Sequence, residues 1–137
     1  MHRKHILGAL VVIAAATIAS PATSASADAG RTYAGCPVGY VCLYKTSTPV
    51  SPPAMKVGGN WSGSISGIKS VFNNGTLNSW PNALIEYKWW NGSIWDDGYK
   101  CVKAATPTVP SRGQFASAVP MTVKWISWLS DSASVCR

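Results

Sequence analysis

GCPVGYVCLYK, residues 35–45, combines two cysteines, a Pro/Gly turn and a strand-like run in one short segment. Cys36 and Cys42 are separated by Pro-Val-Gly-Tyr-Val, and an apolar, aromatic run follows the second cysteine directly. Structural zinc sites and thioredoxin-like redox pairs favour the spacing C-x-x-C, which this pair lacks. We therefore interpret the pair as a short disulfide across a turn that leads into the first strand of a β-domain.

The first residues of the chain have the three-part layout of a secretory signal peptide. MHRKH is basic, ILGALVVIAAATIA is apolar, and SPATSASA ends in small residues. The apolar run is too short to favour a membrane span, although an uncleaved anchor is the alternative. Cleavage after Ala27, or after Ala25 as an alternative, predicts a signal peptide at residues 1–27. The remaining residues, 28–137, are then one secreted domain without an integral membrane segment.

The chain contains four cysteines, and an even number in an exported protein predicts disulfide bonds. Cys36, Cys42, Cys101 and Cys136 allow three pairings. We favour Cys36–Cys42, because it closes a small loop across a Pro/Gly turn. The remaining pair, Cys101–Cys136, would tie the C-terminal cysteine back to the chain.

Few residues of the chain suit catalysis. The histidines, His2 and His5, lie in the predicted signal peptide, which excludes Ser-His-Asp, Cys-His and histidine-based zinc chemistry from the mature protein. A glycosidase needs two facing carboxylates, and the plausible pair is Glu86 with Asp96 or Asp97. Solvated strand and turn positions explain these acids better. We expect no enzyme activity, no cofactor and no metal site.

The mature sequence predicts an all-β fold. Short strand-like runs are separated by Gly, Pro, Asn and Asp clusters, and helical periodicity is absent. Alternation within residues 83–90 should turn Ile85 and Trp89 to one face and Trp90 to the other. The expected strands are residues 40–45, 56–61, 68–73, 83–90, 93–103 and 121–129.

Turn and loop signals separate these runs. Three dipeptides favour hairpin turns, namely Asn74-Gly75, Asn91-Gly92 and Asp97-Gly98. The Pro-rich stretches 46–56 and 104–113 should be exposed loops, because proline has no N–H to donate within a sheet. A Tyr-Lys strand followed by an apolar-Ser-apolar strand occurs twice, as a duplicated Greek-key unit would produce.

CPVGYVCLYK followed by GIKSVFNNG resembles the small secreted actinobacterial metalloproteinase inhibitors (peptidase inhibitor family thirty-six) over about residues 35–75. The resemblance implies a disulfide-stapled, βγ-crystallin-like Greek-key sandwich that blocks an extracellular protease. Calcium-binding motifs of that fold place Asn or Asp before a Ser/Thr-Ser pair. The corresponding stretches here, 66–70 and 123–127, contain a lysine and no carboxylate, so we expect no strong calcium binding.

The first functional hypothesis is a secreted protease inhibitor. Such a protein needs an exposed, extended loop that is held rigid, so that little entropy is lost on docking. The favoured inhibitory loop is Lys100, Cys101, Val102 and Lys103, because a thermolysin-like metalloprotease prefers a bulky apolar residue after the cut bond. The alternative loop runs through Val50 and Met55. Purely structural roles for both segments are the competing interpretation.

The second hypothesis is a carbohydrate or cell-wall binding module. The chain contains seven tryptophans, and flat, exposed indoles can stack on sugar rings. The candidate exposed aromatic residues are Trp61, Trp80, Trp90 and Trp128. The competing interpretation places most of these rings in the core.

A third hypothesis is a killer-toxin-like antimicrobial protein, since residues 28–137 contain ten basic and five acidic residues, a net charge of +5, which together with exposed aromatic residues would suit an anionic membrane. The basic residues are scattered and form neither a run nor an amphipathic helix, which argues against this role and against nucleic-acid binding. We expect a monomer whose partner is an extracellular protease.

Overall fold

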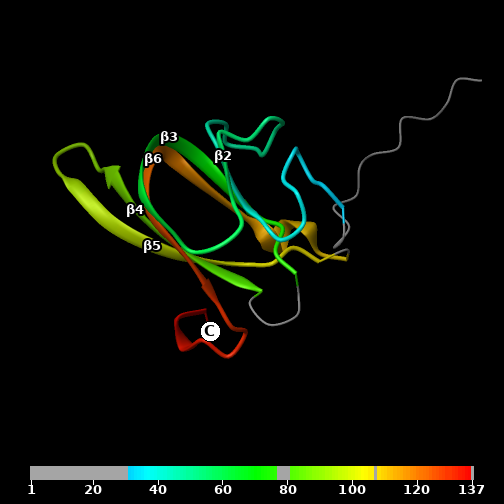
Figure 1. Ribbon diagram of the computed structural model, residues 1–137. Helices are drawn as coiled ribbons and strands as arrows, with labels where there is room; N and C mark the ends of the chain where they lie inside the picture. Colours follow the sequence, from blue (N-terminus) through cyan, green and yellow to red (C-terminus); the bar gives the residue numbers. More distant parts are fainter. Residues whose placement is uncertain (1–30, 77–80, 107, 137) are drawn as a thin grey trace, which may run out of the picture.

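The computed structural model describes residues 31–76, 81–106 and 108–136 (Figure 1). The predicted signal peptide, residues 1–27, and Trp80 lie outside the described residues. The described part contains strands and two short 3-10 turns, and no α-helix. The elements are β1 (Val41–Tyr44), β2 (Met55–Val57), β3 (Trp61–Asn73), β4 (Asn82–Trp90), β5 (Trp95–Lys103), η1 (Pro110–Gly113), β6 (Gln114–Leu129) and η2 (Ser134–Cys136).

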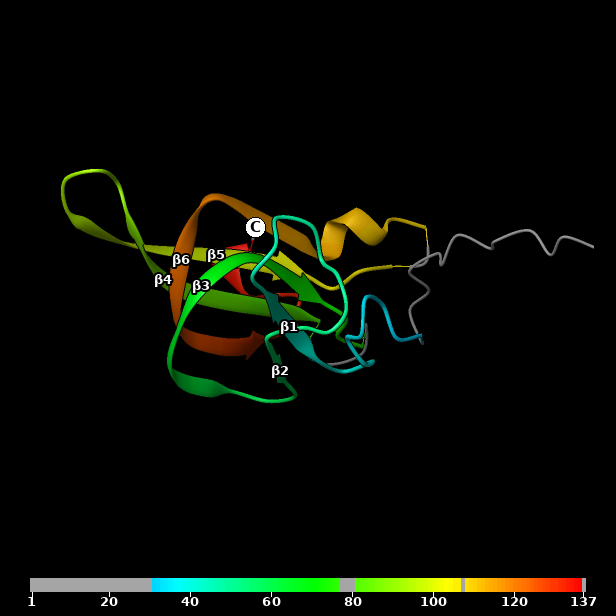
Figure 2. The same cartoon turned by 90° about the horizontal axis from the view of Figure 1, so that it is seen from above.

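The strands pair antiparallel in the order β2-β1-β3-β6-β4-β5. The two longest strands, β3 and β6, curve strongly over the body of the molecule (Figure 2). The start of β3 pairs with the end of β6, as at Trp61↔Ile126, and the end of β3 pairs with the start of β6, as at Phe72↔Gln114. The register shifts around Gly67, whose φ of 76° favours glycine.

This curvature divides the sheet into two four-stranded layers. One layer holds β2, β1, the end of β3 and the start of β6, and the other holds β5, β4, the end of β6 and the start of β3. Each long strand therefore leaves one layer and enters the other. Two Greek-key units that exchange strand segments at bends produce this arrangement. The all-β, disulfide-stapled sandwich predicted from the sequence is confirmed.

One hydrophobic core lies between the layers. Leu43 of β1 and Val57 of β2 belong to the same buried cluster as Ile85 of β4 and Val102 of β5. These strands are at opposite ends of the sheet order. A shared core between them requires that the sheet curl back on itself, as a sandwich does.

Both favoured disulfide bonds are present. Cys36–Cys42 joins the N-terminal turn to β1 and lies in a second buried cluster with Tyr44 and Phe72. Cys101–Cys136 ties η2 to β5. The two bonds therefore restrain the two ends of the described chain.

Two strands start earlier than the sequence predicts. β3 begins at Trp61 rather than at residue 68, and β6 begins at Gln114 rather than at residue 121. The added stretches, WSGSISG and QFASAVP, are rich in Gly, Ser and Ala, which have low β-propensity. Pairing between β3 and β6 holds these stretches extended, and the local sequence pattern does not predict this pairing.

The expected loop at residues 104–113 is only partly exposed. Ala104 and Ala105 are buried, and the Ala105 N–H donates to the Asn73 carbonyl at 3.0 Å. The final residues of this stretch form η1. The prediction of a fully exposed connector is therefore wrong, because this segment packs against the end of β3.

One of the three predicted hairpin turns is confirmed. At Asn91-Gly92 the Asn91 N–H donates to the Ile94 carbonyl at 3.2 Å, and β4 pairs with β5. The prediction at Asp97-Gly98 is wrong, because both residues lie inside β5. The prediction at Asn74-Gly75 is also wrong, because β6 lies between β3 and β4 in the sheet.

Candidate functional site

The favoured inhibitory segment, Lys100 to Lys103, is a strand and not a loop. All four of its residues lie in β5 and pair with β4. Val102 is 2% exposed and belongs to the main core, and Cys101 is bonded to Cys136. The expectation of an exposed loop here is therefore wrong. A strand that a neighbour already pairs, with its apolar side chain buried, does not present a cleavable bond.

The alternative segment contains an exposed loop. Val50 is 48% exposed, whereas Met55 lies in β2 and packs on the main core. Hydrogen bonds hold both ends of the loop: the Ser70 hydroxyl donates to the Thr46 carbonyl at 2.7 Å, and the Ala54 N–H donates to the Leu43 carbonyl at 2.8 Å. The loop borders a groove of about 410 Å³, whose lining includes Tyr44, Val50, Pro52, Pro53 and Ile65.

Two of the expected exposed tryptophans pack against the protein. Trp61 and Trp128 are half-buried on the main core. Each ring covers a glycine: a Cβ on Gly63 would lie 2.6 Å from the Trp61 ring, and a Cβ on Gly75 would lie 2.6 Å from the Trp128 ring. Trp90, in contrast, is exposed as the alternation of β4 predicts.

Four exposed aromatic side chains gather on the outer side of β4, β5 and β6. We call them the aromatic face: Trp90, Trp95, Tyr99 and Trp125 are 45%, 57%, 69% and 45% exposed. Trp90 pairs with Trp95, and Glu86 pairs with Tyr99 on one side and Trp125 on the other. Paired residues point to the same side of a sheet, as do residues four apart in one strand. The register thus places all four rings on one surface.

A β-bulge turns Trp125 outward. Two consecutive residues of β4 pair with Val123 and Trp125 of β6, so Lys124 is an extra residue in that strand. One extra residue reverses which side chains face the core. Val123 is buried before the bulge and Ile126 is buried after it, which leaves Trp125 exposed and brings Trp128 inward.

Neighbouring groups orient these rings. The Trp90 and Trp95 ring centroids are 5.7 Å apart with the planes inclined at 59°, so the two indoles support each other. The Trp125 Nε1–H donates to the Ser127 hydroxyl at 2.6 Å, which restrains the third indole along its strand. The aromatic face is therefore partly preorganised.

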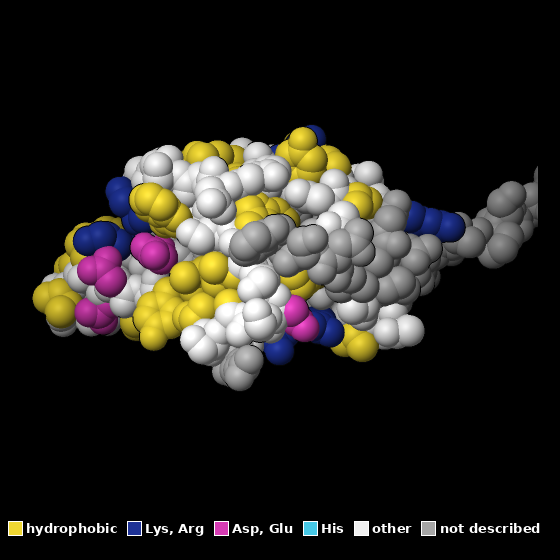
Figure 3. All heavy atoms as spheres, turned by 60° about the horizontal axis from the view of Figure 1, so that its bottom comes forward, with side chains coloured by type: hydrophobic (Ala, Val, Ile, Leu, Met, Phe, Trp, Pro, Cys, Tyr) yellow, Lys and Arg dark blue, Asp and Glu magenta, His cyan; other side chains and the backbone are white. Residues whose placement is uncertain are grey.

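Charged side chains are interleaved with these rings. Lys88 Nζ lies 3.2 Å from Asp97 Oδ1, and Glu86 stands between Tyr99 and Trp125 in the strand order. The charged side chains that β4 and β5 place among the rings are Glu86, Lys88 and Asp97, with a net charge of −1 in a basic chain. Figure 3 shows acidic and basic side chains among hydrophobic ones at the end of the molecule that the β4–β5 hairpin forms.

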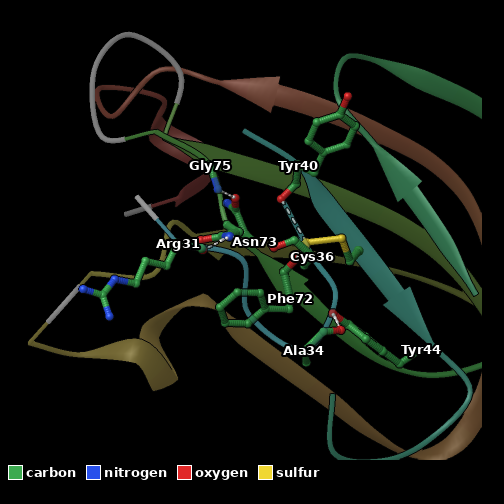
Figure 4. The surroundings of a disulfide bond; sticks show 10 residues. Arg31, Ala34, Cys36, Tyr40, Tyr44, Phe72, Asn73 and Gly75 are labelled. Carbon is green, nitrogen blue, oxygen red and sulfur yellow. Dashed lines mark hydrogen bonds between the residues drawn. A yellow bond between two sulfur atoms is a disulfide. The ribbon is translucent and has the colours of Figure 1, made fainter. Parts of the chain in front are cut away.

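The sequence motif around Cys36 and Asn73 has a structural role (Figure 4). The Asn73 side chain donates to the Pro81 and Val102 carbonyls at 3.0 and 2.7 Å and accepts the Gly75 N–H at 2.8 Å. The neighbouring Asn74 side chain donates to the carbonyls of Arg31 and Cys36, each at 2.9 Å. The two asparagines thus join segments that are far apart in the sequence.

Tyr44 completes this buried region. Its hydroxyl donates to the Ala34 carbonyl at 3.2 Å, and its side chain is 1% exposed. Burial, with a smaller contribution from Tyr33, raises the pKa of Tyr44 to about 12. The phenol therefore stays neutral in the folded protein across the physiological range.

Within the described residues, no three His, Cys, Asp or Glu side chains lie close enough together to hold a metal ion. None of the helical segments in that part of the chain has the length and apolar character needed to cross a membrane.

Comparison of the chain with protein-family models, with curated proteins and with solved structures finds no match. The functional proposal therefore depends on the geometry of the aromatic face and of the Val50 loop.

Proposed function

We propose that this protein is a secreted, non-catalytic binding protein that holds a carbohydrate polymer on its aromatic face. The observation that carries the proposal is the exposure of Trp90, Trp95, Tyr99 and Trp125 on one side of three adjacent strands. Exposure of a group of large aromatic side chains to water does not stabilise the folded state, and such patches mark interaction sites. Two disulfide bonds suit an oxidising, extracellular compartment.

The mixture of groups on this surface favours a sugar as the ligand. A pyranose ring has C–H faces that stack on an indole or phenol ring and hydroxyl groups around its rim that form hydrogen bonds. The aromatic face offers rings for the first contact and Glu86, Lys88 and Asp97 for the second. An anionic membrane fits less well, because the charged side chains that β4 and β5 place among the rings, Glu86, Lys88 and Asp97, have a net charge of −1.

The test is retention of the purified, oxidised protein on insoluble chitin, cellulose and peptidoglycan. We expect retention on at least one of them, and a loss of roughly tenfold or more in affinity for the Trp90→Ala/Trp125→Ala variant, about 1.4 kcal/mol. Tyr40→Ala, which removes an exposed ring of another surface, is the matched control and should bind like the wild type. Failure of the wild type to bind any of the three polymers would overturn the proposal.

Protease inhibition is the second candidate function. Beyond the resemblance of residues 35–75 to metalloproteinase inhibitors, the supporting observation is the exposed Val50 in a loop whose two ends are hydrogen-bonded. A restrained, Pro-rich loop loses little entropy when a protease binds it. The partner would be an extracellular protease.

A panel of thermolysin-like, subtilisin-like and papain-like proteases tests this second function. Inhibition of one of them should be lost in Val50→Asp and retained in Lys100→Ala, whose side chain belongs to β5. Absence of inhibition across the panel at micromolar protein would exclude it.

A further inference from the structure

The charge and spacing of the aromatic face narrow the class of polymer that it accepts. We propose that the face binds an uncharged, insoluble polysaccharide, in which several chains lie side by side, and that it discriminates against polyanionic polymers. This inference rests on the proposed carbohydrate binding and goes beyond it, since it specifies the charge and the physical form of the ligand.

Two acidic residues stand on the aromatic face. Among the described residues the acids are Glu86, Asp96, Asp97 and Asp131. Glu86 and Asp97 share the side of β4 and β5 that carries the rings, whereas Asp96 pairs with Trp89 and points to the other side. The rest of the described chain is predominantly basic. A face suited to a polyanion would carry an excess of lysine side chains, whereas the charged side chains that β4 and β5 place among the rings, Glu86, Lys88 and Asp97, sum to a charge of −1.

Glu86 is the decisive side chain. It is exposed and occupies the position between Tyr99 and Trp125, the rings of the two flanking strands. Lys88 is engaged with Asp97 at 3.2 Å, and no ion pair involving Glu86 is present among the described residues. A polymer lying across both rings must therefore pass over an uncompensated carboxylate. Sugar hydroxyls can donate hydrogen bonds to that carboxylate, whereas polymer carboxylates or phosphates are repelled by it.

The rings of the aromatic face are spread both across the strands and along them, and this arrangement favours a ligand with more than one chain. Tyr99 and Trp125 are two strand spacings apart, roughly 10 Å. Trp90 follows Glu86 by four residues in β4, roughly 13 Å along the strand from that row. Tyr99 and Trp125 form one row across the strands, and Trp90 and Trp95 form a second row. A single extended sugar chain contacts rings along one line, whereas adjacent chains of a solid polymer contact both rows. Several weak contacts on one surface then give avidity that a short soluble oligosaccharide does not gain.

The experiment compares four probes with the oxidised protein: solid cellulose, solid chitin, a soluble cello- or chito-hexaose, and solid polygalacturonate as the polyanion. We expect retention on cellulose or chitin that changes little between low and moderate salt. The soluble hexaoses should compete poorly, and polygalacturonate should retain little protein. Vesicles of anionic lipid are included, and we expect no retention on them.

Charge variants test the role of Glu86. Glu86→Lys should increase retention on polygalacturonate by roughly 25-fold, since it removes the repulsion by one unit charge and adds the attraction of another, each worth roughly fivefold in water. Glu86→Gln should give a smaller increase. Asp131→Lys makes the same change in net charge away from the aromatic face, and we expect it to leave the preference unaltered. Circular dichroism verifies that each variant is folded.

The outcomes separate the two proposals. Failure to bind any polymer overturns the proposed carbohydrate binding itself. Trp90- and Trp125-dependent binding that is equally strong on polygalacturonate, or that falls steeply with salt, leaves carbohydrate binding intact and overturns the selection for uncharged polymers. Tight binding of the soluble hexaose overturns the requirement for a solid. Trp-dependent capture by anionic vesicles contradicts both proposals.

Discussion

Gly98 and Tyr87 face each other across β5 and β4, and this pair shows how single residues determine the outer shape of the sheet. Glycine inside a strand is unfavourable unless another group uses the space that its missing side chain leaves. Here the Tyr87 ring lies over the glycine, as the rings of Trp61 and Trp128 lie over Gly63 and Gly75. At these three positions the space above a glycine is filled by an aromatic ring that packs on the main core.

Gly98→Ala should destabilise the protein by about 1–3 kcal/mol, the usual cost of overfilling a packed site. The added Cβ would lie 2.9 Å from the Tyr87 ring, which must then move. Chemical unfolding measures the effect. Gly59→Ala is the control, because a Cβ there meets no atom within 4 Å, and its effect should stay within about 0.5 kcal/mol. Equal stability of the two variants would contradict the packing role of Gly98.

Tyr44 connects a single buried hydroxyl to the alkaline stability of the protein. Its pKa is raised to about 12 when folded, whereas the ordinary pKa of a tyrosine in an unfolded chain is 10.0. Between these values the unfolded state has lost the proton and the folded state has kept it. The free energy of unfolding should therefore fall as pH rises from about 10 to about 12.

Unfolding titrations of Tyr44→Phe and the wild type test this expectation. The variant has no phenol to ionise, so its stability should fall less steeply over that interval. Tyr99→Phe, which changes an exposed tyrosine, should retain the wild-type slope. Identical alkaline slopes for Tyr44→Phe and the wild type would show that another group is responsible.

At the scale of elements, the β4–β5 hairpin depends on one asparagine. Asn91 Oδ1 accepts the N–H groups of Ser93 and Ile94 at 2.9 and 3.0 Å, and Asn91 Nδ2 donates to Asp96 Oδ2 at 2.7 Å. These bonds close the turn directly beside Trp90 and Trp95, which pair at the end of the hairpin. The turn therefore contributes to the orientation of the two indoles.

Asn91→Ala should loosen the hairpin end without unfolding the domain. The side-chain bonds are exposed, and their loss should cost about 0.5–1.5 kcal/mol. The coupled circular-dichroism signal of the paired indoles should weaken, together with polymer retention. Ser111→Ala, an exposed change in η1, serves as the control. An unchanged indole signal in Asn91→Ala would mean that contacts between the rings alone hold the pair.

At the scale of the whole molecule, the disulfide that closes the longer loop contributes more to stability, with a logarithmic dependence on loop length. Cys101 and Cys136 are 35 residues apart, and Cys36 and Cys42 are six apart. In the chain-entropy model the larger loop corresponds to about 4 kcal/mol and the smaller to about 2 kcal/mol. For a small domain the larger value is a substantial part of the total stability.

Cys101→Ala/Cys136→Ala should therefore lower the free energy of unfolding by about 4 kcal/mol, as measured with denaturant. Val135→Ala, an exposed neighbour in η2, is the control and should change stability little. A loss below about 1 kcal/mol in the cysteine variant would mean that the unfolded chain gains little freedom when this link is cut.

The sequence by itself determined the features that depend on local pattern. The all-β class, the turn at Asn91-Gly92 and the outward direction of Trp90 follow from turn chemistry and strand alternation within single segments. The sequence favoured Cys36–Cys42 from its position across a Pro/Gly turn, which leaves Cys101 to pair with Cys136, although four cysteines alone allow three pairings.

Only the tertiary structure decided which other rings are exposed and where the long strands begin. Strict alternation from residue 121 keeps Trp125 inward and Trp128 outward, and the extra residue Lys124 reverses both. The starts of β3 and β6 are extended only because each is the partner of the other. Alternation assigns a side chain to one of two faces, but bulges, bends and strand exchange decide which face is the core. These depend on contacts between residues far apart in the chain, which no local pattern records.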